Sequence, residues 1–169
     1  MRLLVTSAVA CAATVWLILV HRPRLAGIVG VIAALGLIAG TAAARAARDR
    51  RAVFVGLLLD RALDAAVLAP LAWVLRIHSP GLAVLALIGL AASFVASYER
   101  ARGRSLGYRG AESLAYAATR EALLMIGLMT GWYAVALWAF GLVTAAAAVA
   151  RAWNVAGQER RARLRESRL

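Results

Sequence analysis

Two acidic side chains, Asp60 and Asp64, lie four residues apart inside an otherwise apolar stretch of the chain. Residues four apart in an α-helix share one face, and Gly56 lies one turn earlier on that face. Two stacked carboxylates repel each other unless a cation lies between them, and a divalent metal ion with oxygen ligands would supply that charge. Asp60 and Asp64 are therefore candidate metal ligands, and Gly56 leaves space for a ligand to approach the helix.

A second interpretation of the same carboxylates is an ion pair with Arg61 or with Arg120, which precedes Glu121 in another apolar stretch. A charged side chain deep in a bilayer costs at least about 2.5–3.5 kcal/mol, so such residues usually face a polar cavity or one another. Arg120 could bind a phosphate or neutralise Asp64. The sequence leaves both alternatives open.

Basic side chains gather near the ends of the apolar stretches. Arg45 and Arg48 precede the acidic pair, and Arg102 belongs to the basic segment from Tyr98 to Arg104. Guanidinium groups match phosphate oxygens, so these arginines are candidates for holding a phosphate or an anionic headgroup. The alternative is that they anchor the chain at a membrane surface.

The elements that must position these residues are apolar stretches long enough to cross about 30 Å of hydrocarbon. The chain has 169 residues, of which 63% are hydrophobic, and a mean hydropathy of +0.77, which excludes an ordinary soluble domain. The sequence predicts an all-α membrane protein with a transmembrane helix in each of the six stretches. These are Leu3–Val20, Leu25–Ala44, Ala52–Ile77, Leu82–Tyr98, Leu114–Gly131 and Trp132–Ala152.

The connections between these stretches are short. Basic residues and a proline follow the first stretch where a signal peptide would have small residues, so we expect a membrane helix there. The last two stretches meet at Thr130-Gly131-Trp132, so they form either a tight helical hairpin or a single long broken helix, and we expect the hairpin. We expect a transmembrane domain over residues 1–153 and a basic cytoplasmic tail over residues 154–169.

The distribution of arginine predicts the orientation, because short cytoplasmic loops collect positive charge. If the N-terminus is inside, only Arg22, Arg24 and Arg76 fall on the outer side. This favours an N-in, C-in protein of the inner or plasma membrane with its candidate site facing the cytoplasm. The net charge of +12 lies between apolar blocks, so we expect no nucleic-acid partner. The arginines on the inner side are Arg2, Arg45, Arg48, Arg50, Arg51, Arg100, Arg102, Arg104, Arg109, Arg151, Arg160, Arg161, Arg163, Arg165 and Arg168.

The acidic stretch resembles part of a known signature. Gly56-Leu57-Leu58-Leu59-Asp60-Arg61-Ala62-Leu63-Asp64 fits G-x3-D-x3-D, the second half of the signature of CDP-alcohol phosphatidyltransferases. The segment from Ala96 to Arg102, with Leu106-Gly107, Arg120 and Ile126-Gly127, is similar to the fourth-to-fifth-helix region of actinobacterial phosphatidylinositol phosphate synthases. The resemblance covers most of the chain beyond Leu35 and implies a six-helix membrane bundle.

The resemblance also implies an activity, in which a phosphatidyl group passes from a CDP-linked lipid to an alcohol acceptor and CMP is released. Divalent Mg²⁺ or Mn²⁺ would neutralise the diphosphate. Asp60 would be a metal ligand, and Asp64 both a metal ligand and the general base that deprotonates the alcohol. Family members are typically homodimers, so the resemblance implies a homodimer or a mixed dimer among the membrane lipids. The residues that would help to bind the CDP-linked lipid are Gly56, Arg45, Arg48, Arg102 and Arg120.

The first half of the family signature, D-x2-D-G-x2-A-R, is altered in this chain. It would fall on Leu37 to Arg45 or, three residues later, on Gly40 to Arg48, and neither register supplies an aspartate. The family's first two metal ligands are thus absent, although Ala44-Arg45 or Ala47-Arg48 preserves the A-R pair. The alternative function is therefore a non-catalytic relative that serves as a dimer partner or as a membrane scaffold.

Overall fold

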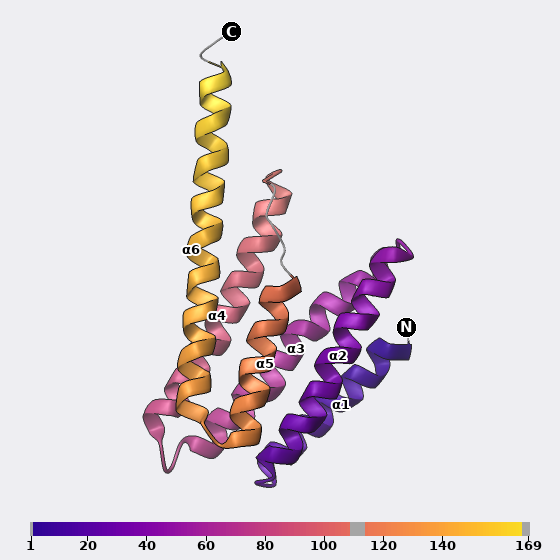
Figure 1. The fold of residues 1–169 in the computed structure, drawn as a ribbon, viewed down its shortest axis with the longest axis vertical. Helices are drawn as coiled ribbons and strands as arrows, with labels where there is room; N and C mark the ends of the chain where they lie inside the picture. Colours follow the sequence, from indigo (N-terminus) through magenta and orange to yellow (C-terminus); the bar gives the residue numbers. More distant parts are fainter. Residues whose placement is uncertain (1, 109–113, 167–169) are drawn as a thin grey trace.

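The computed structural model describes residues 2–108 and 114–166, which form six α-helices (Figure 1). Each apolar stretch predicted from the sequence lies in a helix of its own, which confirms the all-helical architecture. The helices are α1 (Arg2–Leu19), α2 (Pro23–Ala46), α3 (Arg50–Leu75), α4 (Pro80–Ser105), α5 (Leu114–Thr130) and α6 (Tyr133–Glu166).

Residues suited to helix termini separate the helices. Pro23 begins α2, where its missing N–H costs nothing. The carboxylate of Asp49 caps α3 by accepting a hydrogen bond of 3.0 Å from the backbone N–H of Ala52. Gly131 has a φ of +81° between α5 and α6, a conformation that glycine adopts without a steric penalty. The tight hairpin predicted at this glycine is confirmed.

Two helices continue beyond the apolar stretches that mark them. Helix α4 runs to Ser105 instead of Tyr98, and α6 runs to Glu166 instead of Ala152. The length of an apolar stretch is set by the thickness of the hydrocarbon layer. A helix can continue beyond that layer, because arginine, glutamate and alanine all favour helix formation. The boundary predicted after residue 153 therefore falls inside α6. Residues 167–169 of the predicted tail lie outside the described part of the chain.

The helices form a ring in which α1 packs against α2 and α3, α2 against α3 and α5, α4 against α3 and α6, and α5 against α6. The turns α1–α2, α3–α4 and α5–α6 gather at one end of the bundle, which we call the hairpin end (Figure 1). The N-terminus and the α2–α3 turn lie toward the opposite end, here called the terminal end, beyond which α6 projects.

Glycines on α2 let its neighbours approach closely. Gly27 and Gly30 face Met125 and its surroundings on α5, and Gly40 faces Leu4 on α1. A Cβ at Gly27 would lie 3.1 Å from the carbonyl oxygen of Met125, a backbone atom that has little freedom to move. These glycines therefore serve packing within the bundle.

Four helices are long and apolar enough to cross a membrane: Arg2–Leu19, Pro23–Ala46, Pro80–Gly103 and Tyr133–Gln158. Helix α3 carries Asp60, Arg61 and Asp64, and α5 has only 17 residues, so neither joins this group by length and composition. The structure therefore supports a helical membrane protein whose two remaining helices carry the buried charges.

Replacing Gly27 by alanine should destabilise the bundle, because the new methyl group would meet the backbone of α5. We expect Gly27→Ala to lower the free energy of unfolding by about 1–3 kcal/mol, measured by titration with denaturing detergent and circular dichroism. Gly141 is the matched control, since a Cβ there meets nothing within 4 Å. Equal stabilities for Gly27→Ala and Gly141→Ala would contradict the assigned packing of α2 on α5.

Candidate functional site

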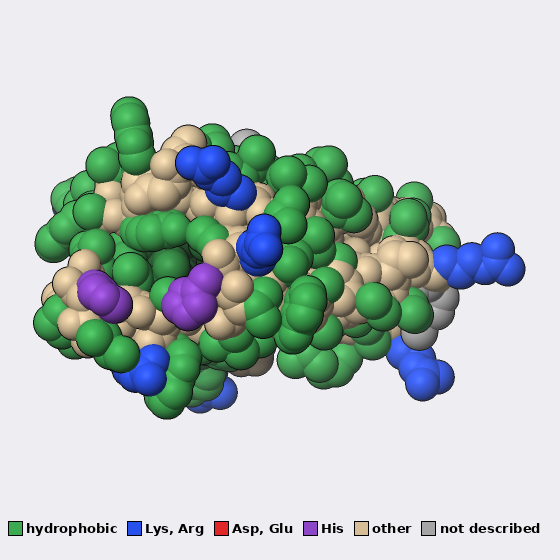
Figure 2. Space-filling view, turned by 90° about the horizontal axis from the view of Figure 1, so that it is seen from below, with side chains coloured by type: hydrophobic (Ala, Val, Ile, Leu, Met, Phe, Trp, Pro, Cys, Tyr) green, Lys and Arg blue, Asp and Glu red, His purple; other side chains and the backbone are tan. Residues whose placement is uncertain are grey.

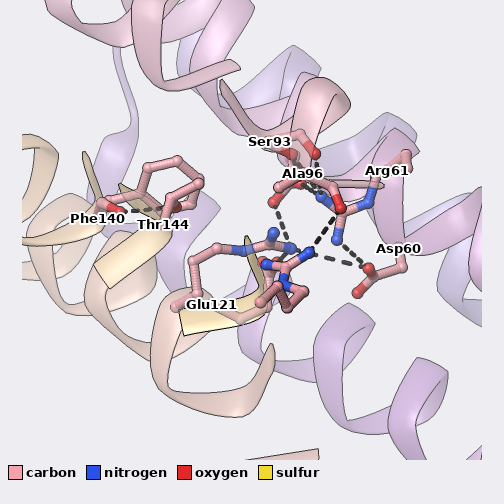
Figure 3. Close-up of polar contacts among 10 residues, drawn as sticks. Asp60, Arg61, Ser93, Ala96, Glu121, Phe140 and Thr144 are labelled. Atoms are coloured by element: carbon pink, nitrogen blue, oxygen red, sulfur yellow. Dashed lines mark hydrogen bonds and ion pairs between the residues drawn. The ribbon is translucent and has the colours of Figure 1, made fainter. Parts of the chain in front are cut away.

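Side chains from three helices meet inside the bundle in what we call the charged cluster (Figure 3). Three carboxyl groups and two guanidinium groups belong to it, so the groups nearly balance in formal charge. Helices α3, α4 and α5 each contribute. The members are Asp60, Arg61, Asp64, Ser93, Arg120 and Glu121.

Asp64 lies at the centre of the charged cluster and is 0% exposed. Its Oδ2 lies 2.7 Å from Nη1 of Arg61, and its Oδ1 lies 3.1 Å from Nη2 of Arg120. The hydroxyl of Ser93 donates a hydrogen bond to Oδ2 and accepts one from Nη1 of Arg61. Each oxygen of the Asp64 carboxylate therefore faces a different guanidinium group, from its own helix and from α5.

Asp60 lies at the edge of the charged cluster, with 20% of its side chain exposed. Its Oδ2 forms an ion pair with Nη2 of Arg61 and lies 3.8 Å from Nη2 of Arg120. The interpretation that the acidic residues of α3 pair with Arg61 and Arg120 is thus confirmed. Arg120 neutralises Asp64, which was one of the two roles open to it.

Arg120 is only 1% exposed and holds α5 against the rest of the charged cluster. Its Nη2 donates a hydrogen bond of 3.0 Å to Oε1 of Glu121, and its guanidinium carbon lies 5.5 Å from the ring centroid of Phe140 on α6. Glu121 is itself buried, and its Oε2 has no hydrogen-bond partner among the described residues. The arginine thus links acidic groups on α3 and α5 with an aromatic ring on α6.

Helical periodicity explains how α3 presents these groups. Gly56, Asp60 and Asp64 follow one another at intervals of one turn, as the spacing predicted. Thr41 of α2 occupies the space over Gly56, because a Cβ at that glycine would overlap the Thr41 hydroxyl. The gap expected at Gly56 is therefore filled by a neighbouring helix, and it brings α2 close to α3.

The other arginines singled out in the sequence lie elsewhere. Arg45 is in the last turn of α2, Arg48 follows that helix, and Arg102 is near the end of α4. All three are exposed, whereas the charged cluster is buried. Their predicted contact with a CDP-linked lipid stays a prediction.

The donor atoms present do not fit a divalent cation. In the described part of the chain, no group of three or more His, Cys, Asp or Glu side chains is arranged to hold a metal ion. The resemblance noted in the sequence would place two further metal ligands at Leu37 and Gly40, or at Gly40 and Ala43, and none of these residues is acidic. Leu37 is instead buried in an apolar group with Leu4. Of the three carboxyl groups in the charged cluster, Asp60 and Asp64 already face guanidinium groups, and Glu121 pairs with Arg120.

Two polar contacts of the site were not foreseen from the sequence. Nothing in the sequence indicated that Ser93 contacts Asp64 and Arg61, because a single serine in an apolar helix usually hydrogen-bonds only to the backbone of its own helix. Arg151 of α6 donates a hydrogen bond of 2.7 Å to the backbone carbonyl of Ala96, and so joins α6 to α4. Its position at the end of the last apolar stretch could have suggested a helix-to-helix contact, but not the partner.

No family model, curated protein or solved structure matches the chain. The likeness to CDP-alcohol phosphatidyltransferases therefore rests on the residues quoted from the sequence, and the activity it implies is taken up below as a proposal.

Removing one member of the charged cluster should leave its partners buried without a counter-charge. We expect Arg120→Gln to lower the free energy of unfolding in detergent by about 3–5 kcal/mol, since Asp64 and Glu121 would both lose a guanidinium. Arg102→Gln, on the exposed surface of α4, should change it by no more than about 0.5 kcal/mol. Similar losses in both variants would show that Arg120 does not stabilise the fold through these ion pairs.

Proposed function

We propose that the chain is a six-span, N-in and C-in membrane protein that keeps the scaffold of a CDP-alcohol phosphatidyltransferase without the transfer reaction. It would act as a dimer partner or scaffold in the inner or plasma membrane. The observation that carries this proposal is the state of Asp64, which is 0% exposed and faces a guanidinium group at each oxygen. A general base must lie within hydrogen-bond reach of the substrate hydroxyl, and this carboxylate is fully buried with a guanidinium group beside each oxygen.

Charge balance supports the same conclusion. Arg61 and Arg120 together bring the two positive charges that one divalent cation would bring to Asp60 and Asp64. A guanidinium group stabilises a buried carboxylate and can donate hydrogen bonds to a phosphate, but it is not a Lewis acid that polarises the phosphate as a divalent cation does. The charged cluster therefore suits the stability of the bundle better than phosphoryl transfer.

The second candidate function is the transferase itself. Asp60 is partly exposed, and the Gly56, Asp60 and Asp64 stripe of the family signature lies on one face of α3. This candidate requires the arginines to leave the carboxylates when a CDP-linked lipid binds. A direct assay separates the two candidates.

The purified full-length chain should release no CMP from CDP-diacylglycerol. We expect the rate with Mg²⁺ or Mn²⁺, and with inositol phosphate or glycerol phosphate as the acceptor, to equal that of Asp64→Asn. The reason is that Asp64 is held by Arg61 and Arg120. Chromatographic detection of CMP measures the rate, and release above the Asp64→Asn control would establish the transferase and overturn the non-catalytic proposal.

A dimer partner must be recovered with its companion. We expect the chain, purified in mild detergent from membranes that express it at its natural level, to elute as a homodimer or in a stoichiometric complex with a full-signature homologue. Light scattering and quantitative mass spectrometry measure the mass and composition of that complex. A monomer without a stoichiometric companion would exclude the dimer-partner role.

A further inference from the structure

A groove runs between α3 and α4 on the outer surface of the bundle, near the hairpin end. Ala69 and Ala72 of α3 and Ala83 of α4 line it, and their small side chains leave room between the helices. Trp73 and Leu87 also line it, and the groove encloses about 360 Å³. That volume falls within the range of small-molecule clefts. The groove is thus an apolar channel that follows the helix axes.

Arg76 lies at the end of this groove, directly after α3. Its guanidinium carbon is 3.5 Å from the ring centroid of Trp73, and its Nη1 donates a hydrogen bond to the backbone carbonyl of Trp73. Stacking on the indole fixes the guanidinium beside the apolar channel and leaves its other face exposed. A cationic group is therefore held at the mouth of an apolar groove.

The hairpin end supplies no acidic partner for this cation. The sequence has no Asp or Glu between residues 65 and 98, which cover the second half of α3 and most of α4. The turns α1–α2 and α5–α6 also lack acidic residues, whereas Arg22 and Arg24 adjoin the first of them. Arginine and histidine side chains, with no acidic ones, are visible on this face (Figure 2). These segments therefore bring no carboxylate that would compete with a negatively charged ligand for Arg76.

We propose that the groove binds one anionic phospholipid, with its phosphate on Arg76 and an acyl chain along Ala69, Ala72 and Ala83. A membrane lipid brings both an apolar chain, which suits the alanine-lined groove, and a negative charge, which suits Arg76. Trp73 lines the groove beside Arg76, and indole rings favour the interface of a membrane. The inference does not depend on whether the charged cluster is catalytic, because the two sites share no residue.

Quenching of Trp73 fluorescence by brominated lipids tests this site. The full-length chain, with every tryptophan except Trp73 changed to phenylalanine, is reconstituted in phosphatidylcholine vesicles that contain brominated phosphatidylglycerol. A second, control protein keeps only Trp138 of α6, which is 60% exposed and so is similar to Trp73 in this respect. The stretch of sequence around Trp138, residues 133–150, contains no charged residue. We expect phosphatidylglycerol to be favoured over phosphatidylcholine about fivefold at Trp73 and not at all at Trp138.

Two substitutions in the protein that keeps only Trp73 test whether the groove causes the preference for phosphatidylglycerol. Arg76→Gln removes the cation, and Ala69→Leu fills the channel at an exposed position that should not disturb folding. Each substitution should reduce the preference for phosphatidylglycerol over phosphatidylcholine at Trp73 to the value measured at Trp138. For every variant, quenching is expressed relative to the fluorescence in unbrominated lipid. Equal preferences at Trp73 and Trp138, or a Trp73 preference that survives either substitution, would overturn the proposal. Absence of quenching at Trp73 would also overturn it, because the groove would then be covered by protein.

Discussion

The Asp64 carboxylate, held between Arg61 of its own helix and Arg120 of α5, is the constraint on which the rest of the bundle depends. A buried charge is tolerated only where partners with good geometry compensate for lost hydration. Two ion pairs and the Ser93 hydroxyl meet that requirement, and the partners from other helices, Ser93 of α4 and Arg120 of α5, fix those helices relative to α3. The glycines of α2 then determine how closely α1 and α5 can approach.

The same cluster explains why α3 and α5 differ in composition from the other helices. Asp64 and Arg61 of α3 and Arg120 and Glu121 of α5 are buried and pair with one another, so these charges do not require exposure to water. On α3, the inward charges give way toward the hairpin end to Leu63, Val67 and Leu68, which are buried in the main apolar core. One helix, α3, therefore carries both the buried ion pairs and, mainly further toward the hairpin end, part of the apolar core.

Sequence patterns predicted the helices and the acidic face of α3 because both depend on local periodicity. The hairpin at Gly131 was predictable for the same reason, since only two residues separate the helices there. What neutralises Asp64 was not predictable, because a metal ion and Arg120 satisfy the same local pattern. The choice depends on distances between helices that lie far apart in the sequence. The ends of α4 and α6 were missed because helical hydrogen bonding continues beyond the apolar residues.

The arginines of the charged cluster lie where a cation would otherwise neutralise Asp60 and Asp64. A divalent cation between Asp60 and Asp64 would lie within a few ångströms of the guanidinium groups that already contact them. At about 4 Å, like charges in a protein repel by several kcal/mol, so cation and arginines exclude each other unless further carboxylates are added. Leu37 and Gly40 add none. The two arginines therefore bring the three carboxyl groups of the charged cluster within one formal charge of balance without a metal ion.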